Sequence, residues 1–315
     1  MRRLALAALV FALALTAQAA QQKTHRTFNI APGGKLVLTA DAGDVRVTTG
    51  GSGVTVDVVA EASESVLKDH RVEFRQDGNT LYVNGDYTNH GWSFFDWNHL
   101  RVRYTIQVPS QFSLDMKTSG GDLNIGDLSG EILARTSGGD VETGRTTGNV
   151  DVKTSGGEVK VRSASGKLIA VSSGGDIEIE DAGGPVEART SGGSIEITRA
   201  GGNVLARSSG GGIRIGEALG AVDATTSGGS ITARISRQPN ADSQLVSSGG
   251  GINVSLAGNV RADLEAHTSG GGIDSNVPVT VLGKQSENDL VGKINGGGPR
   301  LVVRTSGGGI TLKRM

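Results

Sequence analysis

The sequence predicts an all-β protein folded as a β-solenoid, with two short strands in each 18-residue coil and glycine-rich turns between them. Three observations predict this fold. A Ser-Gly-Gly triplet recurs at a spacing of 18 residues, starting at Ser119, Ser137, Ser155, Ser173, Ser191, Ser209 and Ser227. A further glycine divides the units into steps of 10 and 8 residues, at Gly130, Gly148, Gly166, Gly184, Gly202 and Gly220. Between these turn positions apolar and polar residues alternate, as they do in strands with one buried face.

Each unit contains two predicted strands. The first follows the Ser-Gly-Gly triplet, and its inward positions hold Ile177 and Ile179 in the unit that starts at Ser173. The second follows the single glycine, and its inward positions hold a large and then a small residue, Val186 and Ala188 in the same unit. A threonine or serine stands two residues further on, and strand parity turns its hydroxyl inward as well. The predicted core therefore narrows toward the turn, where glycine provides either a positive φ or a close approach of two backbones.

The chain divides into four predicted regions: a signal peptide (1–19), the first solenoid coils (20–61), a hairpin with an aromatic-rich insertion near the N-terminus (62–100), and the solenoid repeats (101–315), strictly periodic over about 117–236. The repeat breaks off in the third region, where Asp77-Gly78-Asn79 is typical of a turn between two antiparallel strands. Beyond Ser227 the spacing loosens, and longer turns are expected between the strands.

The first 19 residues have the pattern of a cleaved secretory signal. Arginines at positions 2 and 3 precede an apolar run over residues 4–15, and Ala17-Gln18-Ala19 has the small-x-small pattern of a cleavage site. A membrane anchor is the other interpretation, but about 12 apolar residues are too few to span a bilayer core of about 30 Å. We therefore predict cleavage after Ala19, a periplasmic or secreted protein, and no transmembrane segment in the mature chain.

Composition excludes several classes of protein. The chain has 31 basic and 32 acidic side chains, so it lacks the positive field that a nucleic-acid partner requires. It has no cysteine, which excludes disulfides and a lipid-modified N-terminal cysteine. Glycine accounts for 50 of 315 residues and proline for 6, and this balance with strict spacing indicates turns rather than collagen or disorder.

The outward positions of the predicted strands form columns along the stack. One column is basic and holds Lys117, Arg135, Lys153, Arg189 and Arg207, and another, across the turn, holds Asp122, Asp140, Glu158 and Asp176. We interpret these two columns as a solvated face whose charges neutralise one another, rather than as a cation site. A third column alternates apolar and acidic residues: Leu133, Asp151, Ile169, Glu187, Leu205 and Asp223. We interpret this alternation as protection against edge pairing rather than as a docking surface.

Four segments carry a resemblance to a known family. They are the signal-like leader, the opening GGKLVLTADAGDVRV, the transition VRYTIQVPSQFSLDMKTSGGDL, and TSGGDVE-like units that end in RTSGGGITL. Together they resemble the bacterial DUF4097 family of β-strand-repeat proteins, which are labelled adhesins by inference from their architecture. The resemblance covers nearly the whole mature chain. It implies a β-solenoid and an exported location, and it supplies no catalytic motif.

Aromatic residues concentrate between Tyr87 and His99, in a segment that holds both tryptophans and that the family pattern does not predict. The candidate binding residues there are His90, Trp92, Phe94, Phe95 and Trp97. Two interpretations stay open. The segment could cap an end of the solenoid, which would otherwise aggregate edge to edge. It could instead form an exposed platform for a glycan or a partner protein, since rigid aromatic rings provide large contact areas at low entropic cost.

The sequence predicts no enzyme, cofactor or metal site. No serine lies in a GxSxG elbow, and the acidic residues are distributed rather than paired at one place. His90, Asp96 and His99 could approach a metal, but three candidate ligands within one loop are a weak signal. We predict an adhesin-like interaction scaffold of the cell envelope that binds an unidentified protein or glycan. The alternative is a glycan-binding module or carbohydrate-active enzyme that uses the aromatic segment.

Overall fold

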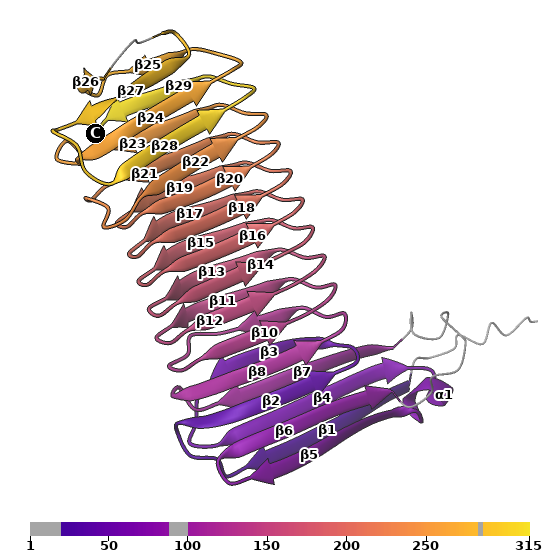
Figure 1. Cartoon of the computed structure of the whole chain (residues 1–315). Helices are drawn as coiled ribbons and strands as arrows, with labels where there is room; N and C mark the ends of the chain where they lie inside the picture. The colour runs from indigo at the N-terminus through magenta and orange to yellow at the C-terminus, as the bar shows by residue number, and fades with distance from the viewer. Residues whose placement is uncertain (1–19, 88–99, 283–285) are drawn as a thin grey trace, which may run out of the picture.

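The chain forms a two-sheeted β-solenoid, in agreement with the predicted fold class (Figure 1). The structure is a computed structural model that describes residues 20–87, 100–282 and 286–315. A sheet of 14 strands, sheet A, faces a sheet of 15 strands, sheet B, along the whole stack. The described residues hold one helix, α1 (Glu64–Leu67). No helix among them is long and apolar enough to cross a membrane.

The spatial order of the strands differs from their order in the sequence at both ends. Sheet A runs through β1 (Ala20–Phe28), β4 (Val54–Ala62), β7 (Arg101–Val108), β3 (Asp44–Thr49), β9 (Leu123–Ile125), β11 (Val141–Thr146), β13 (Val159–Ala164), β15 (Ile177–Ala182), β17 (Ile195–Ala200), β19 (Ile213–Ala218), β21 (Ile231–Ile235), β23 (Ile252–Leu256), β29 (Ile310–Arg314) and β25 (Ile273–Ser275). Sheet B runs through β5 (His70–Asp77), β6 (Thr80–Tyr87), β2 (Gly34–Ala40), β8 (Phe112–Thr118), β10 (Ile132–Arg135), β12 (Val150–Lys153), β14 (Leu168–Val171), β16 (Val186–Thr190), β18 (Val204–Ser208), β20 (Val222–Thr226), β22 (Ser243–Ser247), β28 (Arg300–Thr305), β24 (Ala262–Thr268), β27 (Asp289–Ile294) and β26 (Val279–Val281).

In the central coils, every strand pairs in parallel with the strand 18 residues away. Ile177 is the register partner of Ile195 in sheet A, and Leu168 is the partner of Val186 in sheet B. Each 18-residue unit therefore adds one strand to each sheet. Equivalent apolar residues stack in columns between the sheets, and these columns form one continuous core.

The threonine or serine before each triplet lies inside the core edge, as strand parity predicts. The Thr190 hydroxyl donates to the Gly175 carbonyl oxygen at 2.9 Å and accepts from the Gly193 N–H at 3.2 Å. The same two bonds recur at Thr136, Thr154, Ser172, Ser208 and Thr226. Each hydroxyl thus satisfies a carbonyl of the preceding coil and an amide of its own turn, both of which would be costly to bury unpaired.

The second glycine of each triplet is required by close approach and not by a positive φ. A Cβ on Gly193 would overlap the carbonyl oxygen of Gly175, which is the equivalent glycine one coil away. The glycines of the strictly repeated triplets are absent from the positive-φ residues of the described chain. Of the two reasons that the sequence left open, close approach therefore explains these turns.

At each end, the terminal coil is inserted between two coils that are consecutive in the sequence. The coil formed by β2 and β3 lies between the β6–β7 and β8–β9 coils, and the coil formed by β28 and β29 lies between β22–β23 and β24–β25. Antiparallel strands then cover the outermost coils: β1 and β4 beside β7, β5 beside β6, and β27 with β26 beside β24. Within residues 20–61, β2 and β3 form a coil while β1 and β4 belong to this antiparallel cover.

Aromatic residues of the described chain pack into the N-terminal end of the core. Tyr104 and Phe112 are fully buried, and the rings of Phe28 and Phe74 lie 5.8 Å apart between their centroids. The predicted hairpin is present, and its turn places Gly78 at φ +55°. These four aromatic side chains therefore pack at the N-terminal, antiparallel end of the stack.

Replacing Gly193 with alanine should destabilise the protein by about 1–3 kcal/mol, because two backbones must separate to admit the new methyl group. The control is Gly138→Ala, where the nearest neighbour of the new Cβ would lie at 3.8 Å, an ordinary contact. Urea unfolding of both variants measures the difference. Equal losses in the two variants would contradict the close-approach explanation.

Replacing Thr190 with valine should cost about 1–3 kcal/mol, because the Gly175 carbonyl and the Gly193 amide both lose a partner. Thr190→Ser keeps the hydroxyl and should retain most of the stability. The two variants are compared by urea unfolding. A serine variant as unstable as the valine variant would show that the methyl group, and not the hydroxyl, stabilises this position.

Candidate functional site

The binding residues predicted from the sequence, His90, Trp92, Phe94, Phe95 and Trp97, lie outside the described residues, as do Asp96 and His99. Their role in binding stays a prediction. The segment is flanked by Tyr87, which is buried at the end of β6, and by Leu100, which precedes β7. The candidate site is therefore built from the surfaces that the structure describes.

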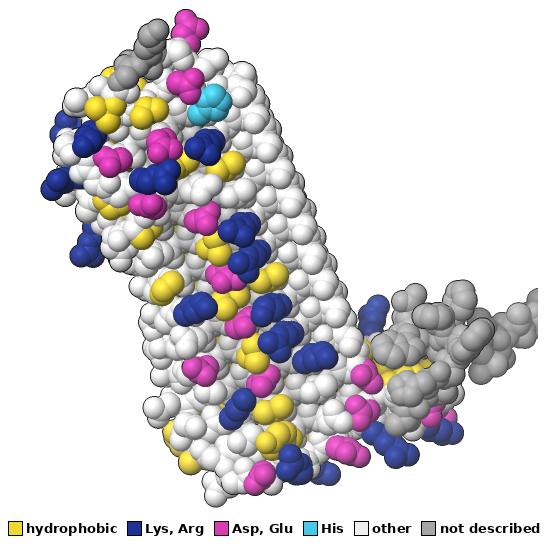
Figure 2. All heavy atoms as spheres, viewed as in Figure 1, with side chains coloured by type: hydrophobic (Ala, Val, Ile, Leu, Met, Phe, Trp, Pro, Cys, Tyr) yellow, Lys and Arg dark blue, Asp and Glu magenta, His cyan; other side chains and the backbone are white. Residues whose placement is uncertain are grey.

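One column of outward side chains crosses the whole of sheet B, and we name it the apolar–acidic track. Each member is the register partner of the next, except that Leu282, just beyond β26, joins through its backbone bond to Val291. In spatial order the track consists of Tyr82, Val37, Asp115, Leu133, Asp151, Ile169, Glu187, Leu205, Asp223, Gln244, Val302, Glu265, Val291 and Leu282. Figure 2 shows apolar and acidic side chains along this face, with basic side chains beside them.

Some apolar members of the track do not come from the 18-residue repeat. Val37, Val302 and Val291 come from segments outside the strict 18-residue period, and insertion of the terminal coils brings them into line. At the C-terminal end Glu265 separates Val302 from Val291, as Asp151 separates Leu133 from Ile169 in the centre. The sequence does not predict these end members of the track, because their strands lie beside the repeats in space but not in the sequence.

The opposite face of the solenoid differs. In the parallel run from β9 to β23, the corresponding column on the outer face of sheet A is polar or charged: Asn124, Glu142, Lys160, Glu178, Glu196, Arg214, Thr232 and Asn253. In sheet B, Leu133, Ile169 and Leu205 are half-buried at the equivalent positions. Apolar outward side chains in the central coils are therefore confined to one of the two faces.

Each acid of the track forms an ion pair with a base on the same face. The pairs are Asp115 with Lys35 at 3.2 Å, Asp151 with Lys153 at 3.1 Å, Glu187 with Arg189, Asp223 with Arg207 at 3.5 Å, and Glu265 with Arg300 at 3.0 Å. Exposed ion pairs of this kind stabilise the protein by at most about 1 kcal/mol each, so a ligand can replace them with its own contacts at low cost. In the part of the chain that the structure describes, the exposed Lys117 and Arg135 of the basic column have no ion-pair partner. The face therefore has a surplus of hydrogen-bond donors.

A groove of about 420 Å³ lies over the N-terminal half of the track. Its lining includes the Lys35–Asp115 pair, Leu133, Asp151 and Ile169, which come from five adjacent strands of sheet B. The groove therefore follows the stack from coil to coil. This orientation suits an elongated ligand that lies along the solenoid axis.

A second hollow of about 600 Å³ lies at the N-terminal end, where Leu100 enters β7. Its lining mixes Asp44 and Glu61 with Arg101 and Arg103, so no single charge dominates it. The adjoining interior holds two buried polar side chains, His70 and Tyr104. The Tyr104 hydroxyl is buried without a hydrogen-bond partner among the described residues.

Burial controls the ionisation of both groups. It raises the pKa of Tyr104 above its ordinary range, and the nearby carboxylates of Asp41 and Asp86 raise it further. Burial also lowers the pKa of His70, against a smaller opposing effect of Asp41. Both side chains are therefore neutral near pH 7, and neither acts as a charged ligand there.

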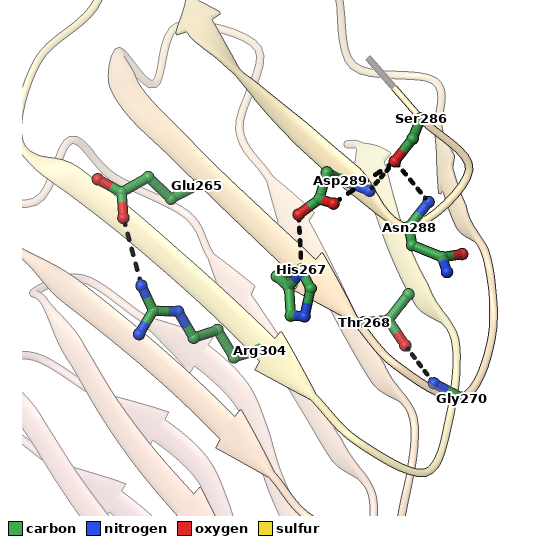
Figure 3. A network of polar contacts seen from close by, with 8 residues as sticks. All are labelled: Glu265, His267, Thr268, Gly270, Ser286, Asn288, Asp289 and Arg304. Atoms are coloured by element: carbon green, nitrogen blue, oxygen red, sulfur yellow. Dashed lines mark hydrogen bonds and ion pairs between the residues drawn. The ribbon is translucent and has the colours of Figure 1, made fainter. Parts of the chain in front are cut away.

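A polar network at the C-terminal end joins β24 to β27 (Figure 3). His267 Nδ1 lies 2.6 Å from Asp289 Oδ1 across the two strands, and the Ser286 hydroxyl accepts the N–H groups of Asn288 and Asp289. The serine hydroxyl contacts the carboxylate and not the imidazole, so the order of a Ser-His-Asp triad is not present.

The antiparallel cover at the N-terminal end has the same kind of contact. His25 Nδ1 lies 2.6 Å from Asp57 Oδ1 between β1 and β4. Cross-strand pairs of this type stabilise neighbouring antiparallel strands. The two histidine–aspartate contacts therefore stabilise the pairing of the end strands. Among the described residues, no three histidine, aspartate or glutamate side chains come together as a metal-binding set.

A family model described as Toastrack DUF4097 matches residues 34–313. The chain belongs to this family. No curated protein matches the sequence. The expected resemblance to DUF4097 proteins is therefore confirmed over most of the chain.

Solved structures resemble this DUF4097 chain at low identity. A "putative adhesin" from Bacteroides fragilis NCTC 9343 is 16% identical, with 95% of this chain and 99% of that chain covered and a TM-score of 0.40. A "putative lipid binding protein" from Parabacteroides distasonis ATCC 8503 is 12% identical, with 93% and 96% covered and a TM-score of 0.32. A "putative adhesin" from Parabacteroides merdae ATCC 43184 is 12% identical, with 95% and 97% covered and a TM-score of 0.31. At these TM-scores the likeness carries no functional argument.

The buried His70 should make the stability of this DUF4097 protein depend on pH. Its pKa is lowered in the folded state from the ordinary value of 6.5, so the unfolded chain binds the proton more readily. The free energy of unfolding should therefore fall as the pH drops below 6.5, and the loss should be complete once the pH is below the folded-state pKa. Urea unfolding at several pH values, compared with His70→Gln, measures this contribution. An equal decline in both proteins would assign the pH dependence to other groups.

Proposed function

We propose that this DUF4097 protein is an exported, non-enzymatic scaffold of the bacterial cell envelope, with an adhesin-like role, that binds a partner protein or glycan along the apolar–acidic track. The observation that carries the proposal is the continuity of the track across sheet B. It alternates from Val37 to Asp223 and again from Val302 to Val291, on strands that come from distant parts of the sequence. The signal-like leader supports export.

The distribution of apolar side chains supports a docking role for this face. Leu133, Ile169 and Leu205 occupy outward positions of sheet B. The equivalent outward positions of sheet A hold polar or charged residues, so the fold does not require apolar side chains there. Apolar side chains on one face only are typical of interaction surfaces. Protection against edge pairing accounts less well for them, because these three residues lie on inner strands of sheet B and not on an edge strand.

The shape of the molecule supports a scaffold. Its 14 members, about 4.8 Å apart, give the track a length of roughly 62 Å. Its members are fixed by backbone pairing between strands, so a partner meets a preorganised surface and binding costs little conformational entropy of the scaffold. A long, rigid and repetitive surface suits an elongated partner better than a small substrate.

The test measures binding of the labelled mature chain to the cell-envelope fraction of the source bacterium. The track variant carries Leu133→Ser, Ile169→Ser and Leu205→Ser. Its matched control carries Glu142→Ser, Glu178→Ser and Arg214→Ser, which lie on the same three coils in sheet A. The track variant should bind at least about tenfold more weakly, since loss of about 1.4 kcal/mol suffices, and the control should bind normally.

A third variant, Trp92→Ala with Trp97→Ala, separates the track from the aromatic segment. If only this variant loses binding, the aromatic segment is the binding site and the track is not. Normal binding by the track variant would likewise contradict the proposal. Thermal unfolding of all variants checks that each is folded.

A further inference from the structure

We propose that the partner of the apolar–acidic track is a proline-rich segment in the polyproline II conformation, which lies along the solenoid axis with every third residue on an apolar position. This inference rests on the proposed function and names the chemistry of the partner. It follows from three features of the track: its period, the donors beside it, and its lack of free aromatic rings.

The period of the track selects the conformation of the ligand. Leu133, Ile169 and Leu205 occupy every second strand of sheet B, with one acid between each two of them. Neighbouring strands lie about 4.8 Å apart, so the apolar positions recur at about 9.6 Å. A ligand that contacts all of them must present side chains on one side at this spacing.

Polyproline II fits this spacing better than other polypeptide conformations. It has three residues per turn and a rise of about 3.1 Å, so every third residue returns to one side after about 9.3 Å. An α-helix returns to one side after seven residues, or about 10.5 Å, and is out of step by nearly 3 Å after the three repeats from Val37 to Leu205. A β-strand presents one side at multiples of about 6.7 Å, which do not match. Polyproline II accumulates a mismatch of only about 1 Å over the same three repeats.

The hydrogen-bonding groups beside the track complement such a ligand. Lys and Arg side chains are donors only, and Lys117 and Arg135 of the basic column have no ion-pair partner within the described chain. A proline-rich segment has free carbonyl oxygens and few N–H groups, because proline has no N–H and polyproline II has no internal hydrogen bonds. The surplus of donors on the protein therefore meets a surplus of acceptors on the ligand.

The acids of the track do not oppose this arrangement. Asp151 and its equivalents are paired with bases, so their charge is balanced where they lie between two apolar positions. The groove over Leu133 and Ile169 follows the same axis and receives the ligand there.

The composition of the track favours a peptide over a glycan. Sugar rings stack most effectively on aromatic side chains, whereas the described track is aliphatic apart from Tyr82. The guanidinium carbon of Arg75 lies 4.0 Å from the centre of the Tyr82 ring and covers one of its faces. Aliphatic side chains at a regular spacing suit the pyrrolidine rings and aliphatic groups of a proline-rich chain.

The test uses a fluorescent peptide of about five Leu-Pro-Pro repeats, which spans roughly 46 Å in polyproline II. Its affinity for the mature chain is measured by fluorescence anisotropy. A second peptide of Leu-Pro-Pro-Gly repeats keeps the side chains but breaks the three-residue period. An unlabelled oligosaccharide of β-1,4-linked glucose is the competitor that represents a glycan partner.

The Leu-Pro-Pro peptide should bind, and its Kd should rise at least about tenfold in the Leu133→Ser, Ile169→Ser, Leu205→Ser variant, but not in the sheet A control. The four-residue peptide should bind at least about tenfold more weakly than the first. Equal binding of both peptides, equal binding to the track variant, or no binding would each overturn the inference. Displacement by the glucose oligosaccharide would assign the track to a glycan and overturn it as well. If binding to the cell envelope still depends on the track in any of these cases, the proposed function stands and only the partner's chemistry is wrong.

Discussion

Backbone hydrogen bonding between neighbouring coils fixes their separation at about 4.8 Å, and the rest of the structure depends on this spacing. At the turns, the backbones stack so closely that the Gly175 carbonyl occupies the place of a side chain on Gly193. The turn hydroxyls, such as that of Thr190, then satisfy the buried groups that the stacking leaves at the core edge. The glycines, the turn hydroxyls and the aliphatic core residues are therefore all required by the same close spacing of the coils.

A stack of identical coils exposes unpaired backbone at its two ends, and the same arrangement of strands protects both of them. Its first and last coils, β2–β3 and β28–β29, are inserted one place inside the stack. Antiparallel strands cover the coils that remain outermost, which limits the unpaired backbone available for edge-to-edge association. The His25–Asp57 and His267–Asp289 contacts lie within these covers. At both ends, therefore, the spatial order of the strands departs from the sequence order, and the pairing changes from parallel to antiparallel.

The same spacing gives the outer surface its regularity. An alternation of two residue types over adjacent strands becomes a repeat of about 9.6 Å in space, which is rigid because the backbone ladder is rigid. Sheet A uses its outward positions for polar and charged groups, whereas sheet B places Leu133, Ile169 and Leu205 among ion pairs. This difference between two faces of one repeat connects the fold to the proposed binding role.

The sequence by itself determined the solenoid, the two strands per coil, the inward aliphatic columns and the inward hydroxyls, because these follow from an 18-residue period and the alternation of side chains along a strand. It also contained the central members of the track, from Leu133 to Asp223. Only the tertiary structure decided that glycine serves close approach, and that Val37 and Val302 extend the track. The physical reason is that alternation specifies which side of a strand is buried but not which strand lies beside it, and neighbours at the ends are chosen by how the terminal coils insert and how the open edges are covered.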